Sequence, residues 1–138
     1  MTTTCPDTAR LRLPATASSV PLARRAIAEL CERLQLSATE TSEVKLAVTE
    51  ACTNVVLHAY ADRPEAGGLL EVEAGMEGDR LRVVVRDHGR GVVPRADSPG
   101  LGVGMSLIAV LAESVEIRSG GAGTPTEVVM RFRLRRAG

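Results

Sequence analysis

Apolar positions recur with a helical period in the first half of the chain and with a period of two in the second half. Within residues 18–36, apolar side chains recur at spacings of three and four, as on one face of an amphipathic helix. They are Leu22, Ala26, Ile27, Leu30 and Leu34. Residues 37–60 continue the helical period, and Ser37 or Thr39 is placed to cap this second helix. Before both helices, the alternating segment Arg10–Pro14 predicts a short edge strand.

After the second helix, the pattern predicts strands. Residues 69–75 and 80–87 alternate between apolar and polar side chains, and the turn-forming Glu77–Asp79 joins them, which predicts an antiparallel hairpin. The polar face of this hairpin sets two glutamates against two arginines, the pairing expected on a solvated face. These four residues are Glu71, Glu73, Arg82 and Arg86. Residues 114–119 and 126–134 alternate in the same way. Because every strand is apolar on one side, the sequence predicts an α+β fold: a two-layer sandwich with a mixed, largely antiparallel sheet and all helices on one face.

The composition fits a single domain spanning residues 1–138, with residues 1–9 and 135–138 expected to fray. Seventeen basic residues balance seventeen acidic ones, so the chain lacks the basic excess that direct binding of nucleic acid favours. An odd number of cysteines with no CxxC pair argues against a disulfide framework or a zinc site and favours a reducing compartment. They are Cys5, Cys31 and Cys52. With no apolar run of about 18 residues and no signal-peptide pattern, we expect a cytoplasmic protein that does not contact a membrane.

The second predicted helix carries a polar stripe within apolar surroundings. Glu50, Asn54 and His58 recur every four residues and, at 100° per residue, lie within an arc of about 80°. Leu46 and Leu57 border this stripe on its far side. The stripe is either a solvated helix face or a functional site, and helical periodicity alone leaves both interpretations open.

Asp87 ends the second strand of the predicted hairpin. By alternation it lies on the apolar face, so a carboxylate is expected to point towards the helices. The sequence then continues as Asp87-x-Gly89-x-Gly91, a pattern that on its own indicates only a turn after a strand.

Glycines alternate again at the end of the segment 88–104, just before the helix predicted to begin at Met105. Glycines let backbone N–H groups approach a ligand closely, and a helix N-terminus favours an anion, so this loop is able to hold phosphates. The last glycines are Gly100, Gly102 and Gly104. The chain has a single lysine and no GxxxxGK[ST] sequence, which excludes a Walker-type P-loop.

Taken in order, three segments resemble the motifs of one enzyme superfamily. "EACTNVVLHAY" (50–60), "DHGRG" (87–91) and "GVGMSLI" (102–108) resemble the N, G1 and G2 boxes of the GHKL, or histidine kinase-like, ATPases. The form E-A-x-x-N-x-x-x-H-A-Y, with a short lid, is most similar to the bacterial anti-sigma factor serine/threonine kinases. The resemblance implies the Bergerat ATP-binding fold, ATP and Mg²⁺ as cofactors, and residues 88–104 as an ATP lid.

The resemblance also implies residue roles. Asn54 matches the Mg²⁺ ligand, Glu50 the general base, and Asp87 the acceptor for the adenine amino group. Gly91 matches the glycine that lets the base approach, with Gly89 beside it. The lid residues expected at the phosphates are Gly102, Gly104 and Met105.

Four further positions are less sharply defined by the resemblance. Thr126 matches a threonine near the adenine, but Pro125 stands where the family usually has glycine, and Gly123–Thr124 is a rival alignment. His58 matches a common family position to which we assign a structural role. Either of the lid arginines is able to meet the γ-phosphate; they are Arg90 and Arg95.

The resemblance implies that the chain regulates transcription by acting on other proteins. The chain would bind an alternative sigma factor, and would phosphorylate a STAS-domain anti-anti-sigma factor on serine or threonine. A homodimer is implied as well. The main alternative is a non-catalytic ATP-binding module that sequesters a partner. An ATPase clamp ranks last, because the larger relatives use a transducer domain that this short chain lacks.

Overall fold

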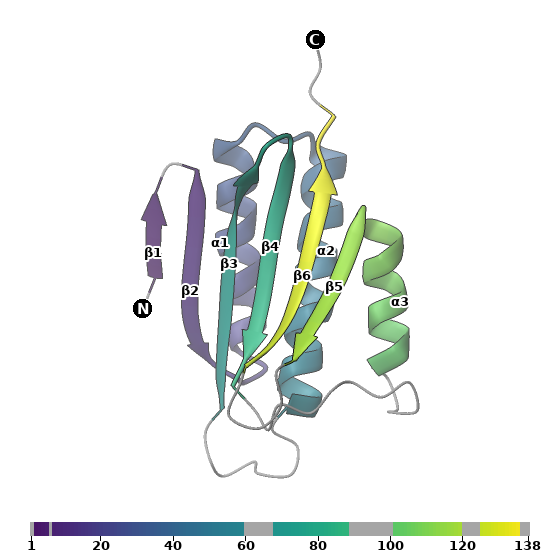
Figure 1. The fold of residues 1–138 in the computed structure, drawn as a ribbon. Helices are drawn as coiled ribbons and strands as arrows, with labels where there is room; N and C mark the ends of the chain where they lie inside the picture. The colour runs from purple at the N-terminus through teal and green to yellow at the C-terminus, as the bar shows by residue number, and fades with distance from the viewer. Residues whose placement is uncertain (1, 6, 60–67, 89–100, 120–124, 136–138) are drawn as a thin grey trace.

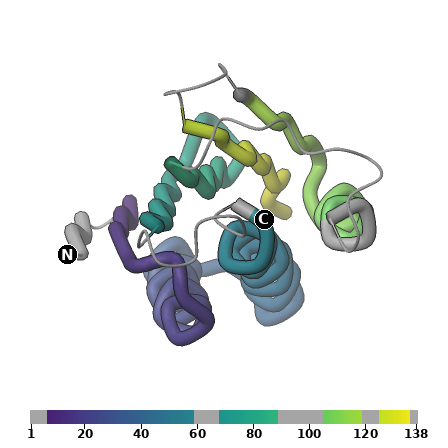
Figure 2. The backbone as a smooth tube through the Cα atoms, turned by 90° about the horizontal axis from the view of Figure 1, so that it is seen from below, coloured from purple at the N-terminus to yellow at the C-terminus, as the bar shows by residue number. Residues whose placement is uncertain are grey.

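The computed structural model describes residues 2–5, 7–59, 68–88, 101–119 and 125–135, which form a sheet covered by helices on one side (Figures 1 and 2). The elements, in chain order, are β1 (Thr2–Cys5), β2 (Thr8–Pro14), α1 (Ser19–Arg33), α2 (Ala38–Asn54), the π-helical turn η1 (Val55–Ala59), β3 (Leu69–Glu77), β4 (Arg80–Asp87), α3 (Leu101–Leu111), β5 (Ser114–Ser119) and β6 (Thr126–Arg133). This arrangement confirms the predicted α+β two-layer sandwich. Among the helices of the described residues, none is long and apolar enough to cross a membrane.

The sheet has six strands in the order β1-β2-β3-β4-β6-β5, and each of its five neighbouring pairs is antiparallel. The sequence predicts a mixed sheet, whereas the described strands contain no parallel pair. The reason is that β6 inserts between β4 and β5. These two strands run in the same direction but do not touch, so the connection through α3 creates no parallel ladder.

The hairpin predicted from the sequence is confirmed, while the expected edge strand is displaced. β3 and β4 pair from Leu70↔Asp87 to Glu77↔Arg80 around a turn in which Gly78 has a φ of 64°. Residues 1–9 were expected to fray, but β1 pairs with β2, so β2 is an internal strand and β1 is the edge.

The core lies between the sheet and the helices α1 and α2, and α3 packs against α2. The buried stripe of α1 is shifted from the predicted one, because Leu22 is 47% exposed and Ala23 is fully buried instead. Ser37, rather than Thr39, caps α2: its hydroxyl accepts from the backbone N–H of Glu40 at 3.0 Å. The Glu40 carboxylate accepts in turn from the backbone N–H of Ser37 at 3.0 Å, which completes a capping box.

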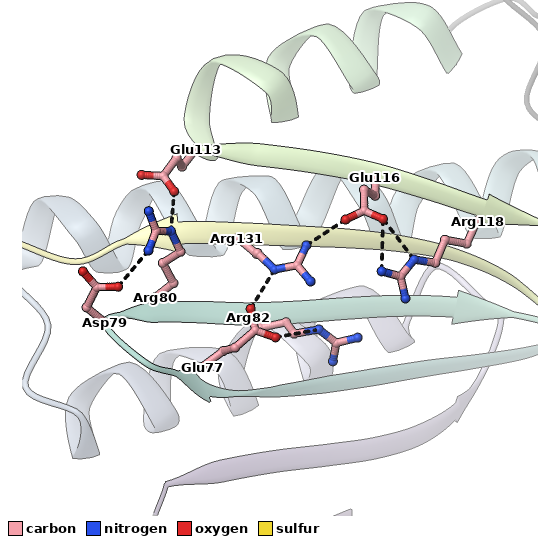
Figure 3. Close-up of polar contacts among 8 residues, drawn as sticks. All are labelled: Glu77, Asp79, Arg80, Arg82, Glu113, Glu116, Arg118 and Arg131. Atoms are coloured by element: carbon pink, nitrogen blue, oxygen red, sulfur yellow. Dashed lines mark hydrogen bonds and ion pairs between the residues drawn. The ribbon is translucent and has the colours of Figure 1, made fainter.

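The helix-free face of the sheet is covered by ion pairs between neighbouring strands, some of which are drawn in Figure 3. The predicted pairing of glutamates with arginines is confirmed for Arg86, which meets Glu73 at 3.2 Å and lies opposite Glu71 in the register. It is wrong for Arg82, which lies opposite Gly75 and pairs with Glu77 at 3.6 Å instead. Sequence alternation also places Val84 on this polar face, but Val84 and its cross-strand partner Val129 are fully buried. Charged side chains therefore shield an apolar strip on the side that carries no helix.

Candidate functional site

Four chain segments with predicted site residues meet at one end of the sandwich (Figure 1). The C-terminal ends of α2 and β4 lie there, beside the beginnings of β6 and α3. The antiparallel order explains this convergence, because β4 runs towards this end and β6 starts from it. Residues far apart in the sequence are thereby brought to the same end of the sheet.

The polar stripe of α2 is neither solvated nor part of the core. Glu50, Asn54 and His58 are each half-buried, whereas Leu46 and Leu57 beside them are exposed. This pattern, with leucines more exposed than the polar residues beside them, is the reverse of that in an ordinary amphipathic helix, whose polar residues are the exposed ones. The burial pattern therefore favours a functional site over a solvated helix face.

The amide of Asn54 contains a buried donor. Its Nδ2 atom is buried and has no hydrogen-bond partner within the part of the chain that the structure describes. Leaving a buried polar group unpaired costs about 1–3 kcal/mol, so this N–H donor calls for an acceptor such as a water molecule or a ligand oxygen. The other end of the same amide is a carbonyl oxygen, a ligand type that Mg²⁺ accepts. Asn54 thus fits the predicted role at a metal–phosphate site.

The α-helix ends at Asn54, and the next five residues form the π-helical turn η1. The sequence predicts an uninterrupted α-helix through this region. A π-turn is wider than an α-turn, so it rotates each residue by less than 100° and brings His58 back towards the line of Glu50 and Asn54. The stripe is therefore narrower than the α-helical projection of the sequence indicates.

Asp87 and Thr126 are directly opposite each other at the site end of the sheet. Asp87 continues the core-facing row of β4 after Val83 and Val85, as alternation predicts. Thr126 is buried and opens β6, and both residues take part in polar interactions. The structure thus joins two predicted base-contacting residues into one cross-strand pair.

The beginning of α3 differs from the prediction. The sequence places Gly102 and Gly104 in a loop that ends before a helix at Met105, whereas α3 already begins at Leu101. Both glycines therefore lie in its first turn, where the first backbone N–H groups of a helix have no intrahelical acceptor. Met105 is half-buried and packs against the core.

Several predicted residues lie outside the described residues. They are Gly89, Gly91, Arg90, Arg95 and the rival pair Gly123–Thr124.

No cluster of three or more histidine, cysteine, aspartate or glutamate side chains suited to a metal ion occurs in the described ranges. A hollow of about 430 Å³ exists on the helix-free face near Gly75 and Arg82, and none of the predicted site residues lines it.

Comparison with known proteins agrees with this geometry. Residues 13–132 match the histidine kinase-like ATPase domain family. The chain belongs to this family. Relatives include the serine-protein kinase RsbW of Halalkalibacterium halodurans, which is 30% identical over 128 residues covering 82% of this chain and 76% of that protein. The anti-sigma F factor of Clostridium beijerinckii is 28% identical over 124 residues, or 81% of this chain and 85% of that protein.

A solved structure shows the same fold. The RsbU and RsbW domains of a Mycobacterium tuberculosis protein align with a TM-score of 0.73 over 95% of this chain, at 22% sequence identity. This chain spans about a third of that one, covering 33% of its length. The family match and the relatives above place the chain among the histidine kinase-like ATPases of the anti-sigma factor kinase type, as the three sequence motifs predict.

Proposed function

We propose that this chain is an ATP-dependent anti-sigma factor. It binds an alternative sigma factor in the cytoplasm, and it transfers phosphate from ATP to a serine or threonine of a STAS-domain anti-anti-sigma factor. The observation that carries the proposal is the convergence of the C-terminal end of α2, whose last turns contain Glu50 and Asn54, with the end of the sheet at which Asp87 pairs with Thr126. The names of the relatives, serine-protein kinase and anti-sigma factor, support the same role.

The site divides the recognition of ATP between its two sides. Asp87 accepts a hydrogen bond from the adenine amino group, with the Thr126 hydroxyl beside it. Asn54 would hold Mg²⁺ together with the phosphates, and Mg²⁺ would supply neutralisation of the phosphate charge. The N-terminal turn of α3, which contains Gly102 and Gly104, supplies backbone N–H groups and the positive end of the helix dipole.

Glu50 serves as the general base. It precedes Asn54 by four residues, about one helical turn, so both side chains face the same region. The attacking serine or threonine oxygen bonds to the γ-phosphorus, and the bond between this phosphorus and the bridging oxygen of ADP breaks. Glu50 takes the hydroxyl proton as the new bond forms.

Phosphate transfer would switch the partner. A phosphoserine or phosphothreonine adds a charge of about −1.5 to −2 at neutral pH, enough to disrupt an interface that buries it. The modified STAS protein would leave, and the sigma factor would then be bound. We also propose a homodimer, and light scattering that shows a monomer at micromolar concentration with nucleotide present would contradict it.

The catalytic claim is tested with the purified chain, Mg·ATP and the STAS-domain proteins of the same organism. Wild-type protein is expected to produce a phosphoprotein, and Glu50→Gln to slow transfer by a factor of about 100 or more while ATP still binds. Glu43→Gln is the matched control, because Glu43 is also half-buried on α2 and lies two turns earlier. If a STAS partner and ATP are both bound and no phosphate is transferred, the kinase assignment is wrong.

The metal role of Asn54 is tested separately by calorimetry. ATP is expected to bind the wild type more tightly with Mg²⁺ than without it, and Asn54→Ala is expected to abolish this difference.

A Glu50→Gln variant that still regulates its sigma factor normally would favour the non-catalytic binding module instead.

A further inference from the structure

Arg86 forms ion pairs with carboxylates on both neighbouring strands, on the helix-free face of the sheet. Its guanidinium lies 2.6 Å from Glu127 of β6, 3.2 Å from Glu73 of β3 and 3.8 Å from Glu71 of β3. The Arg86 side chain is only 17% exposed. Ion pairs that are partly removed from water are screened less than surface pairs, so this one cation joins three strands effectively.

The register places this cluster directly behind the nucleotide site. Arg86 lies between Glu71 and Glu127, and the following residue of β4, Asp87, lies opposite Thr126. Successive side chains of a strand point to opposite faces of the sheet. Arg86 and Asp87 therefore point to opposite faces of β4. The ion pairs of Arg86 connect the same segments of β4 and β6 from which Asp87 and Thr126 face the core.

The position at the end of β4 makes such support important. β4 ends at Asp87, and a strand terminus opens more readily than the centre of a sheet. His88 follows and also contacts the Glu71 carboxylate on the helix-free face. Side-chain contacts between β4 and β3 thus continue beyond the last residue of β4.

The Glu71 carboxylate is stabilised in its ionised form by the groups around it, Arg86 among them. Burial opposes the ionisation of Glu71, but the hydrogen bond and charge of His88, together with the charges of Arg86 and Arg12, outweigh it, so the pKa of Glu71 is lowered. Arg12 lies 3.9 Å from Glu71 and is mostly exposed, which makes it a weak substitute. Without Arg86, the partly buried carboxylates of β3 and β6 would repel each other across β4.

We propose that Arg86 is a positioning residue for the nucleotide base: from the opposite face of the sheet, it holds Asp87 in register with Thr126. The inference rests on the proposed ATP-binding function and extends it to a residue that does not touch ATP.

Arg131 provides a matched control on the same face (Figure 3). It is 20% exposed and pairs with Glu77 at 2.8 Å and with Glu116 at 3.0 Å. It lies five residues along β6 from Thr126, about 17 Å away. Loss of Arg131 removes comparable ion pairs and leaves the site end of the sheet intact.

The test compares Arg86→Gln, Arg86→Lys and Arg131→Gln. Binding is measured for ATP and for inosine triphosphate, which has a carbonyl oxygen in place of the amino group that Asp87 would accept from. Arg86→Gln is expected to raise the Kd for ATP about tenfold and to leave that for inosine triphosphate unchanged. Arg86→Lys is expected to restore part of the ATP affinity, and Arg131→Gln to change neither Kd. In an Asp87→Ala background, Arg86→Gln is expected to cause no further loss.

A second readout needs no nucleotide. Amide hydrogen exchange at Asp87 and Thr126 is expected to be faster in Arg86→Gln than in Arg131→Gln. Equal weakening of both nucleotides by Arg86→Gln, or an effect no larger than that of Arg131→Gln, would overturn the inference. Wild-type protein that binds no ATP would overturn the proposed function, and the base-positioning role with it. ATP binding by the wild type that Arg86→Gln leaves unchanged would overturn only the role of Arg86.

Discussion

Glu40 connects the start of α2 to the C-terminal end of the chain, and its ionisation is expected to stabilise the fold. Its carboxylate accepts from the backbone N–H of Ser37 at 3.0 Å and from that of Arg135 at 2.6 Å. The hydrogen bond from Ser37, with that from Arg135, outweighs the effect of burial and holds the pKa of Glu40 below its usual value.

The expected size of the effect follows from these contacts. Interactions of a helix cap contribute typically about 1 kcal/mol. One further hydrogen bond at an exposed carboxylate adds about 0.5 kcal/mol, the low end of the usual range. Glu40→Ala is therefore expected to lower the free energy of unfolding by about 1–2 kcal/mol, which corresponds to a fall in Tm of roughly 3–6 °C for a domain of this size. Glu40→Gln keeps an acceptor for the capping box and should cost less.

The pH dependence gives the sharper test. Because the pKa of folded Glu40 lies below the unfolded value of about 4.5, its contribution is complete above that value and is lost as the pH falls through the folded pKa. Urea unfolding followed by circular dichroism should show wild type more stable than Glu40→Gln at pH 7, with a smaller difference at pH 3.5. Glu32→Gln, at an exposed position of α1, is the control. A difference that is equal at both pH values, or larger in acid, would refute the assignment to the ionised carboxylate.

Three further predictions concern the helix end, the helix-free face and the cysteines. Gln35 has a φ of 59° just after α1, a conformation that glycine adopts without strain, so Gln35→Gly should stabilise the protein by about 0.5–1 kcal/mol in urea unfolding; a loss would contradict this reading. Val84→Ala should cost about 1–2 kcal/mol in the same measurement despite lying on the polar face, and a cost near zero would show that the ion pairs do not bury it. Burial raises the pKa of Cys31 to about 11 and that of Cys52 to about 12, so in a Cys5→Ser background neither thiol should react with iodoacetamide until denaturant is added. Labelling of the folded protein would contradict the buried positions of these thiols.

The sequence predicts those features that depend on local periodicity. Alternation assigns Asp87 to the core face of its strand, and the helical period assigns Glu50 and Asn54 to one stripe, because each pattern is a direct consequence of backbone geometry. The pairing of Glu71 with Arg86 also follows from the hairpin register. Such predictions require only neighbours along the chain or across one turn.

Other features depend on contacts that no local pattern encodes. Val84 is buried between Glu73 of β3 and Val129 of β6, its neighbours in the register, and this arrangement requires the order of the strands. Gly102 and Gly104 have low helix propensity and therefore indicate a loop, but the chain forms helix from Leu101 onward. The π-turn after Asn54 has no signature in a projection that assumes 100° per residue.

β4 connects the two faces of the sheet and so connects the site to a surface that ATP would not touch. Asp87 faces the helices, while Arg86 and His88 on either side of it face the ion pairs on the opposite surface. Since consecutive residues of a strand share one backbone, a substitution among these ion pairs is expected to shift the strand that carries Asp87 without entering the site. Ion pairs at the Arg131 end of the same face are separated from Asp87 by most of the length of β4 and lack this connection. Substitutions near Arg86 are therefore expected to change the affinity for ATP, whereas equivalent substitutions near Arg131 are expected to change only the free energy of unfolding.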